Sequence, residues 1–458
     1  MLESAKLQIL FGLSDGIGSH VRRTYRDFLS MERFSNGQLA DQAEVRLGAV
    51  LRHAAEYVPY YRERVTAGGP TMLSDFPILA KAEIGGHFTE FMTPELRESF
   101  QNGPGRGYSW IQVKTGGSSG VPTTVIHDAS FRDQGRGSRL YSQTLCGFPF
   151  GRPHFRLWGS MAEINHARDS LGKRVMSALS GEQWLNAFLM DEARMTQYVE
   201  VINRSTVQYM MAYFDAAVAL ADFVKRRSLT VRPLSGIMAC AGTVTDSGRA
   251  LLQEVFKARV HNKYGSRECT DMACECEHGG LHRYSHHAHL EVVDDQGRPV
   301  EAGVTGRLLV TLLGNPSFPL IRYEIGDMAA LSDRICLCGR PFPLLERLEG
   351  RKLEFLTSTR GGFVSPVYIR HLIGVVHNPG CIRCFQLIQE RNGLYRLSLV
   401  LDPEVGEPVA AGLAGAIRTD LLAVLGGNAV LEINRVSGIP TSASGKFLYT
   451  MNRSGGAA

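Results

Sequence analysis

The sequence lacks any uninterrupted run of about 18 apolar residues, the length that a helix needs to cross a membrane. The N-terminal segment has only a short apolar stretch, 7–13, between the acidic residues Glu3 and Asp15. A secretory signal would instead combine a basic start with a longer apolar region. We therefore expect a cytoplasmic protein with no membrane span.

The sequence also has no large excess of positive or negative charge. Lys and Arg number 50 against 45 Asp and Glu, and the net charge is +5. The charges are interspersed, without the long basic run that follows a nucleic-acid backbone. Tandem repeats are absent, and so is low-complexity sequence apart from the small tail 455–458. We expect no nucleic-acid partner, and the length of 458 residues suggests two to four domains.

The cysteines do not form the pattern of a disulfide framework. The chain has nine cysteines, so they cannot all pair, and six of them fall in close pairs. Close pairs in a reducing compartment favour metal binding. Three sulfurs and one imidazole, from Cys276, His282, Cys336 and Cys338, would make a closed tetrahedral site for a structural Zn²⁺. The alternative is a set of reduced core thiols, since cysteine is commonly buried without metal.

Other residues near this set are rival ligands, namely Cys269, Cys274 and His278. The pair Cys381 and Cys384 is interpreted as free thiols beside a strand. Three further histidines alternate in a strand-like segment, so we interpret them as surface or packing residues rather than ligands. They are His286, His287 and His289.

We predict a large N-terminal domain, 1–349, and a smaller C-terminal domain, 350–458. Residues 1–100 are expected to be mainly helical, with apolar positions at helical spacing. From 101 to 349 short β-rich runs alternate with helical stretches, which predicts an α/β domain with a largely parallel sheet. The last domain is predicted to be α+β. Its expected elements are a strand at 353–356, a helix from Pro366, a hairpin at 391–393, a helix at 410–425 and a strand at 429–433.

A stretch rich in glycine and hydroxyl groups lies between two predicted strands, at 115–122. Backbone N–H groups and hydroxyls in such a loop can donate many hydrogen bonds to the oxygens of a polyphosphate. The candidate donors are Thr115, Gly116, Gly117, Ser118, Ser119 and Gly120. The frame is not that of a phosphate loop with a closing lysine, because Val121 and Pro122 follow. The alternative interpretation is an ordinary turn between strands.

Three more loops follow predicted strands and contain glycine near a hydroxyl or carboxylate, at 241–244, 264–268 and 319–327. Loops at the carboxyl ends of strands commonly bind ligands in open α/β sheets. Each loop alone could be an ordinary turn, so their combination carries the inference.

Five motifs occur in the order and spacing of the adenylate-forming enzymes, which the chain resembles. They are the loop at 115–122, Tyr-Gly-x-x-Glu at 264–268, Arg-Tyr-x-x-Gly-Asp at 322–327, Gly-Arg at 350–351 and Ser-Gly-Lys at 444–446. Within this superfamily the chain is most similar to the phenylacetate-coenzyme A ligase branch, and especially to its capsular-polysaccharide-associated members. Two positions depart from the pattern. Val121 stands where a lysine is common, and Leu353 stands at the usual acidic hinge position.

The resemblance implies a site for ATP and Mg²⁺. The loop at 115–120 would hold the leaving phosphates, and Glu268 would be a ligand of Mg²⁺, which takes few protein carboxylates. Asp327 would accept hydrogen bonds from the ribose hydroxyls. The adenine, ribose and phosphates would also meet Tyr264, Gly265, Gly242, Thr243 and Arg351.

The resemblance further implies that Lys446 bridges the acid's carboxylate and the α-phosphate, and that the C-terminal domain rotates after adenylation. The implied reaction makes an acyl-AMP from a small carboxylic acid and passes the acyl group to coenzyme A. Transfer to an amine and a degenerate nucleotide-binding scaffold are the alternatives. The acid itself is not encoded in any spacing rule.

Overall fold

The structure is a computed structural model of the chain. It describes residues 20–65, 72–103, 109–114, 123–159, 181–349, 356–360, 363–364, 366–439 and 449–454. The chain divides into two compact units. The first unit comprises Met1–Lys114, Thr123–Arg152 and His261–Gly350, and the second comprises Thr115–Pro122, Pro153–Val260 and Arg351–Ala458. The division into domains 1–349 and 350–458 stays a prediction.

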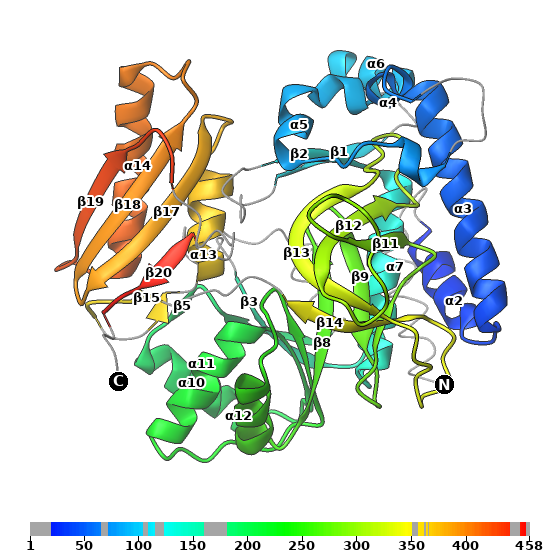
Figure 1. The fold of residues 1–458 in the computed structure, drawn as a ribbon. Helices are drawn as coiled ribbons and strands as arrows, with labels where there is room; N and C mark the ends of the chain where they lie inside the picture. The colour runs from blue at the N-terminus through cyan, green and yellow to red at the C-terminus, as the bar shows by residue number, and fades with distance from the viewer. Residues whose placement is uncertain are drawn as a thin grey trace. The chain divides into compact units, whose positions relative to one another are not determined.

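The N-terminal part of the first unit is mainly helical, as predicted (Figure 1). Its helices are α2 (Val21–Met31), α3 (Asn36–Tyr57), α4 (Pro59–Arg62), α5 (Lys81–Gly86) and α6 (Pro94–Asn102), with 3₁₀ turns at Leu73–Asp75 and Phe88–Phe91. Helix α3 begins at a capping box in which Ser35 and Gln38 bond each other's backbone. It ends at Val58, whose extended backbone is the conformation that the following proline favours.

The strands of the first unit pair antiparallel. Strands β1 (Trp110–Lys114) and β2 (Thr124–Asp128) form a two-stranded sheet, as predicted for the flanks of the glycine loop. The larger sheet has the order β11-β12-β13-β14-β10-β9-β8. These strands are β8 (Arg259–Ser266), β9 (Thr270–Glu275), β10 (Leu281–Arg283), β11 (Ala288–Val293), β12 (Gly306–Leu312), β13 (Tyr323–Ser332) and β14 (Leu344–Glu349). Helix α7 (Ala129–Leu145) packs against β9 and against α2.

The second unit contains a parallel sheet of order β7-β6-β3-β4. Its strands are β3 (His154–Trp158), β4 (Glu182–Asn186), β6 (Tyr209–Tyr213) and β7 (Gly236–Cys240), and its helices are α10 (Glu192–Arg204), α11 (Phe214–Arg226) and α12 (Asp246–Phe256). Most of the strand pairs described between 101 and 349 are antiparallel, so the predicted largely parallel sheet was wrong. No helix lies between β8 and β14, and connections without a crossover helix favour antiparallel neighbours, whereas β6 and β7 are joined by the crossover helix α11.

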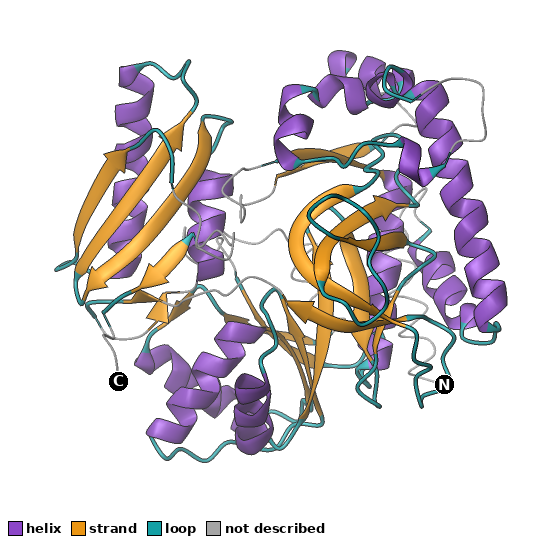
Figure 2. Cartoon of the chain, viewed as in Figure 1, coloured by secondary structure: helices purple, strands orange, loops and turns teal. Residues whose placement is uncertain are grey.

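The C-terminal part of the second unit is α+β, as predicted (Figure 2). A four-stranded sheet has the order β19-β18-β17-β20, and a small sheet has the order β15-β16-β5. The elements are β5 (Leu189–Met190), β15 (Leu356–Thr357), β16 (Phe363–Val364), α13 (Pro366–His371), a π-helical turn (Leu372–Val376), β17 (Ile382–Arg391), β18 (Leu394–Leu401), α14 (Glu407–Leu425), β19 (Val430–Arg435) and β20 (Thr450–Asn452). Gly393 has φ +78° in the predicted hairpin turn.

Helix α14 is long and apolar enough to cross a membrane by length and composition alone. Its side chains explain that composition differently. Ile417, Leu421 and Leu425 are fully buried in the core that α14 shares with the C-terminal sheet. Away from this buried face, Arg418 donates a hydrogen bond to the carbonyl oxygen of Leu431, and Asp420 forms an ion pair with His377. We interpret α14 as a core helix of the α+β fold.

Candidate functional site

In the first unit the structure joins two predicted ligand residues, Tyr264 and Asp327. The Tyr264 hydroxyl donates a hydrogen bond of 2.8 Å to Asp327 Oδ2. Tyr264 belongs to β8 and is 8% exposed, while Asp327 belongs to β13, 63 residues further along the chain. The contact fixes the carboxylate without enclosing it, because Asp327 is only partly buried. Such a carboxylate can accept hydrogen bonds from a diol while its protein partner holds it in place.

A bulge in β13 presents Asp327. Residues Leu309 and Arg307 of β12 pair with Glu324 and Met328 of β13, so three residues of β13 face one residue of β12. Gly326 lies in this bulge at φ +89°, a conformation that a side chain would strain. The bulge turns the backbone out of the ladder beside Asp327, which explains why the motif contains glycine at that position.

The arginine of the same motif has a structural role. Arg322 is 9% exposed, and its guanidinium pairs with Glu291 at 3.3 Å and donates to the carbonyl oxygen of Phe76. Its backbone has φ +49°, and its N–H donates to the hydroxyl of Thr311. These contacts hold the start of β13, so Arg322 positions the bulge rather than a ligand.

Glu268 lies in the tight turn between β8 and β9. Its side chain is buried, with 4% of the residue exposed. Tyr323 donates a 3.1 Å hydrogen bond to Glu268 Oε1, and the ammonium of the buried Lys81 lies 3.8 Å from the same oxygen. His127 of β2 lies 2.9 Å from the backbone oxygen of Glu268, and burial lowers the pKa of this histidine. Both the side chain and the backbone oxygen of Glu268 are therefore held in place.

Gly265 allows β8 and β9 to approach at this turn. A Cβ atom there would lie 3.0 Å from Asp271 Cα and still closer to the carbonyl oxygen of Thr270. Both are backbone atoms that cannot rotate away. Gly265 is thus required for the turn that carries Glu268, whatever its relation to a nucleotide.

We expect Gly265→Ala to lower the stability of the protein by about 2 kcal/mol, because the β8 and β9 backbones must separate to accept a methyl group. Differential scanning calorimetry would measure this as a lower Tm. Gly412→Ala is the control, since Gly412 lies in α14 with no atom within 4 Å of the new Cβ, and alanine favours a helix. An unchanged Tm for Gly265→Ala would contradict the account of this turn.

Gly242 and Thr243 belong to the second unit, where they follow β7. The preceding residue, Ala241, has φ +58°, which is uncommon for a residue with a side chain. A Cβ at Gly242 would lie 2.9 Å from Oδ2 of Asp215. It would also lie 3.3 Å from Cβ of Phe214, so the loop passes close to the start of α11.

Three predicted parts of the nucleotide site lie outside the described residues. They are the glycine loop with Thr115, Gly116, Gly117, Ser118, Ser119 and Gly120, the junction residue Arg351, and Lys446. Their roles stay predictions.

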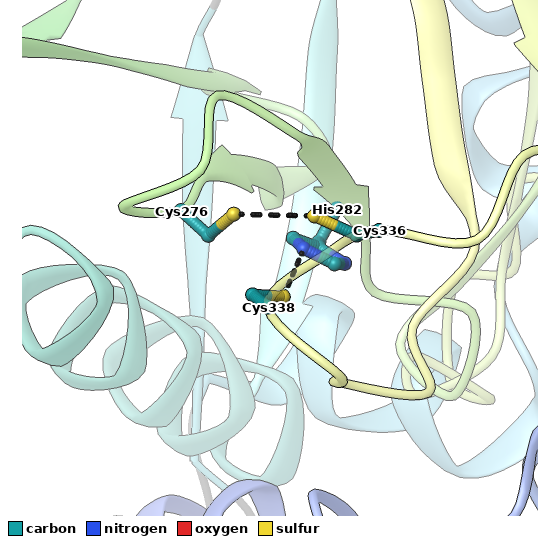
Figure 3. Close-up of side chains that lie close together, drawn as sticks. All are labelled: Cys276, His282, Cys336 and Cys338. Carbon is teal, nitrogen blue, oxygen red and sulfur yellow. Dashed lines mark hydrogen bonds between the residues drawn. The ribbon is translucent and has the colours of Figure 1, made fainter.

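The four residues predicted to bind zinc come together in the first unit (Figure 3). One potential ligand atom from each of Cys276, His282, Cys336 and Cys338 lies within 4.8 Å of all the others. Cys276 Sγ is 3.5 Å from Cys336 Sγ, and Cys338 Sγ is 3.2 Å from His282 Nε2. Two sulfurs bound to one tetrahedral Zn²⁺ would lie about 3.7 Å apart, given Zn–S bonds of about 2.3 Å. The donor set and its spacing therefore fit Zn²⁺.

The surroundings of this quartet also suit a metal. His282 Nδ1 lies 2.8 Å from the carbonyl oxygen of Phe342, so its proton on that side directs Nε2 toward the sulfurs. Burial lowers the pKa of His282, which favours the neutral imidazole that binds metals. The backbone N–H groups of His278 and Arg340 point to Cys276 Sγ and Cys338 Sγ at 3.4 and 3.5 Å. These contacts would stabilise thiolates.

Strand pairing brings the quartet together from distant positions. Cys276 follows β9 and His282 lies on β10, whereas Cys336 and Cys338 lie in the connection from β13 to β14. Strand β10 pairs antiparallel with β14, which brings that connection to the β9–β10 turn. A Cβ at Gly280 would lie 2.7 Å from Cys336 Sγ, so the turn needs glycine there.

The rival ligands lie elsewhere. Cys274 Sγ is 3.7 Å from Cys146 Sγ in a buried pair, and Cys269 is fully buried in the core of the first unit. His278 contributes its backbone N–H to Cys276 rather than joining the quartet. None of the nine cysteines, all of which lie in the described residues, forms a disulfide. Two of the histidines expected to pack do so, since His286 and His287 are 5% and 1% exposed. His286 meets the ring of Phe28 edge to face, and His287 stacks on Phe131.

Comparison with known proteins finds several relatives of this chain. Residues 356–453 match the family model of the CapK C-terminal domain. Phenylacetate-coenzyme A ligase of Thermus thermophilus is 24% identical over 410 residues, which cover 85% of this chain and 86% of that protein. Protein CapK of Staphylococcus aureus is 23% identical over 271 residues, 58% of each chain. The chain is thus similar to a phenylacetate-coenzyme A ligase over most of its length and to CapK over more than half of it.

A solved structure supports the fold of this ligase. The crystal structure of 2-hydroxyisobutyryl-CoA ligase in complex with 2-HIB-AMP and CoA, in the thioesterification state, superimposes with a TM-score of 0.52. The two proteins are 16% identical, and the match covers 92% of this chain and 91% of the other. At this identity the match shows a shared fold, that of an adenylate-forming enzyme with a smaller C-terminal domain.

The site of the ligase includes residues that the sequence did not single out. Tyr323 belongs to the Arg-Tyr-x-x-Gly-Asp motif, so its hydroxyl could have been considered as a partner for a carboxylate. Lys81 and His127 come from α5 and β2 and have no spacing signal, because each reaches Glu268 only through the fold. They are candidates for holding the turn that carries Glu268.

Proposed function

We propose that this ligase activates a small carboxylic acid with ATP, releases pyrophosphate to form an acyl-AMP, and then transfers the acyl group to coenzyme A. The observation that carries the proposal is the fixed pair Tyr264 and Asp327 in the β13 bulge, with Glu268 held in the turn that follows Tyr264. These residues belong to two ordered motifs of the family. A scaffold without chemistry would not need the Ser-Gly-Lys motif that ends at Lys446.

In the adenylation step an oxygen of the acid's carboxylate attacks the α-phosphorus of ATP, and the bond from that phosphorus to the pyrophosphate oxygen breaks. Negative charge builds up on the phosphate oxygens, so the site must offer positive charge and hydrogen-bond donors. The loop at 115–120 would donate to the leaving phosphates, and Lys446 would place its ammonium between carboxylate and α-phosphate. Asp327 would hold the ribose.

Glu268 would hold Mg²⁺, which neutralises charge on phosphate oxygens when it is bound. A single fixed carboxylate suits this ion, since Mg²⁺ keeps most of its ligands as water and phosphate oxygens. The hydrogen bond from Tyr323 occupies Oε1 and sets the orientation of the carboxylate.

The Cys/His quartet would hold one Zn²⁺ as a structural ion. Three sulfurs and one imidazole fill a tetrahedral shell, so no position is open for a substrate. The ion would join the β9–β10 turn to the connection between β13 and β14. Its contribution would be to the stability of the first unit.

ATP–pyrophosphate exchange across a library of aliphatic, aromatic and amino acids tests the proposed adenylation. At least one acid should support exchange that depends on Mg²⁺. Adding coenzyme A or an amine with that acid then separates the two acceptors by their products, a thioester or an amide. No exchange with any acid would leave the nucleotide-binding scaffold, and an amide product would replace coenzyme A by an amine acceptor.

We expect Tyr264→Phe to raise KM for ATP about 10-fold with little change in kcat. The variant loses the hydrogen bond that orients the Asp327 carboxylate, and a hydrogen bond to a charged group contributes about 1.5–3 kcal/mol. Steady-state kinetics with ATP varied would measure it. Tyr57→Phe is the control, because Tyr57 is 44% exposed on α3. An unchanged KM for ATP would contradict a role for the pair in nucleotide binding.

A further inference from the structure

Arg340 lies between the Cys/His quartet and helix α2. It is two residues beyond Cys338, and its side chain is only 20% exposed. Its backbone N–H points to Cys338 Sγ at 3.5 Å. Its Nη1 lies 2.8 Å from both carboxylate oxygens of Glu277, the residue that follows Cys276. Arg340 therefore joins the two segments that supply the cysteines of the quartet.

The same guanidinium reaches the end of α2. Arg340 Nε donates a 2.9 Å hydrogen bond to Oε1 of Glu32, the residue that caps the C-terminal end of this helix. Tyr141 of α7 donates a 2.8 Å hydrogen bond to the same oxygen. The Glu32 side chain is 30% exposed, so solvent screens the ion pair only in part. An arginine with two carboxylate partners can hold segments together better than an isolated surface pair can.

A second set of contacts connects the quartet to α2. His282 Nδ1 lies 2.8 Å from the carbonyl oxygen of Phe342. The centroid of the Phe342 ring lies 5.6 Å from that of Tyr141. Phe28 of α2 stacks on the same tyrosine at 5.0 Å and is 1% exposed. The segment 338–342 thus meets the C-terminal half of α2 through an ion pair and through a buried aromatic cluster.

The start of α2 is held differently. Tyr25 shares a 2.8 Å hydrogen bond with Thr144 of α7. Gly137 of α7 allows the two helices to approach, since an added Cβ there would lie 2.6 Å from the side chain of Thr24. Neither contact involves the segment 336–342. We therefore expect only the C-terminal end of α2 to depend on the quartet.

We propose that Zn²⁺ bound by the quartet holds the C-terminal end of α2 on the first unit, with Arg340 as the positioning residue between them. The inference rests on the zinc site proposed above and goes beyond adenylation. Without the ion, only weak contacts hold the three cysteines and His282 together, so the segment 336–342 is free to move and its contacts with α2 lose their support. Because linkage is reciprocal, the ion pair with Glu32 should in turn raise the affinity for Zn²⁺.

Zinc affinity of the full-length protein, measured by competition with a chromophoric chelator, gives the first test. Residues that support metal ligands from outside typically change affinity about 10- to 100-fold. We expect Arg340→Met to weaken Zn²⁺ binding at least about 10-fold and Glu32→Gln about 5-fold. The two effects should not add, since both variants lose the same ion pair. Arg334→Met is the control, because Arg334 lies in the same connection but is exposed and pairs with Glu346.

Amide hydrogen exchange of the wild type gives the second test and needs no variant. Removing zinc with a chelator should speed exchange at the C-terminal end of α2, 28–31, about 10-fold. The amides at 25–27 of the same helix should change little, because contacts with α7 hold that part. Helix α6 should also keep its exchange rates.

Unchanged exchange at 28–31 after zinc removal would overturn the proposal, and so would an unchanged zinc affinity in both variants. A uniform rise in exchange through the first unit would mean general unfolding and would also contradict it. A protein that binds no zinc would lose both the metal site and the attachment of α2. Zinc binding without any effect on α2 would leave the metal site and remove only the attachment. Pyrophosphate exchange decides adenylation independently of these results.

Discussion

Lys446→Ala should slow acyl-AMP formation roughly 100- to 1000-fold and leave the transfer to coenzyme A close to the wild-type rate. Lys446 lies outside the described residues, so the expectation rests on the Ser-Gly-Lys motif at 444–446 and its family spacing. The ammonium is useful only where the acid's carboxylate and the α-phosphate approach each other. If the C-terminal domain rotates between the half-reactions, the lysine cannot contribute to the second.

Single-turnover kinetics would measure each half-reaction separately. The first uses ATP and the acid, and the second uses preformed acyl-AMP and coenzyme A. Lys225→Ala is the control, because Lys225 is an exposed lysine of α11 that pairs with Glu254. Equal losses in both half-reactions would contradict domain rotation, and no loss in either would mean that the motif is incidental.

Cys338→Ser should lower Tm by at least about 5 °C, with a much smaller change in ATP affinity. A closed site of three thiolates and one imidazole contributes folding free energy, and serine is a poor ligand for Zn²⁺. Elemental analysis of the wild type should find about one zinc per chain. The quartet holds the β9–β10 turn against the connection between β13 and β14, so its loss should loosen the first unit.

Cys381→Ser is the matched control for zinc. Cys381 is a partly buried free thiol of the second unit outside the quartet, so its replacement should keep both the zinc content and Tm. A wild-type protein that is stable and free of zinc would mean that the four side chains are only reduced thiols and a packed histidine.

The local elements of the chain could be predicted where one pattern dominates. Residues 45–57 have a strong helical period and a proline follows at 59, and α3 ends at Tyr57. Asn392 and Gly393 separate two alternating runs, and a hairpin forms there. Strand direction could not be predicted in the same way, because β-rich runs look alike whether their neighbours are parallel or antiparallel. Connection length was the better signal after residue 259.

The candidate site shows a similar limit. Tyr264 and Asp327 could be named because glycine turns in motifs mark them, but their hydrogen bond depends on a bulge whose register no spacing reveals. Cys336 and Cys338 could be named from their close spacing, but their approach to Cys276 and His282 depends on the pairing of β10 with β14. Arg340 gave no signal in the sequence, since an arginine after a cysteine pair is ordinary until its partners are known.

Isotope transfer tests the central claim, that a carboxylate oxygen attacks the α-phosphorus of ATP. An acid that supports exchange is labelled with ¹⁸O in its carboxylate and incubated with the enzyme, ATP and coenzyme A. The masses of AMP and pyrophosphate are then measured by mass spectrometry. Cleavage of the acyl–oxygen bond during transfer should leave one labelled oxygen in AMP and none in pyrophosphate. Unlabelled AMP, or ADP with labelled inorganic phosphate, would contradict an acyl-AMP intermediate.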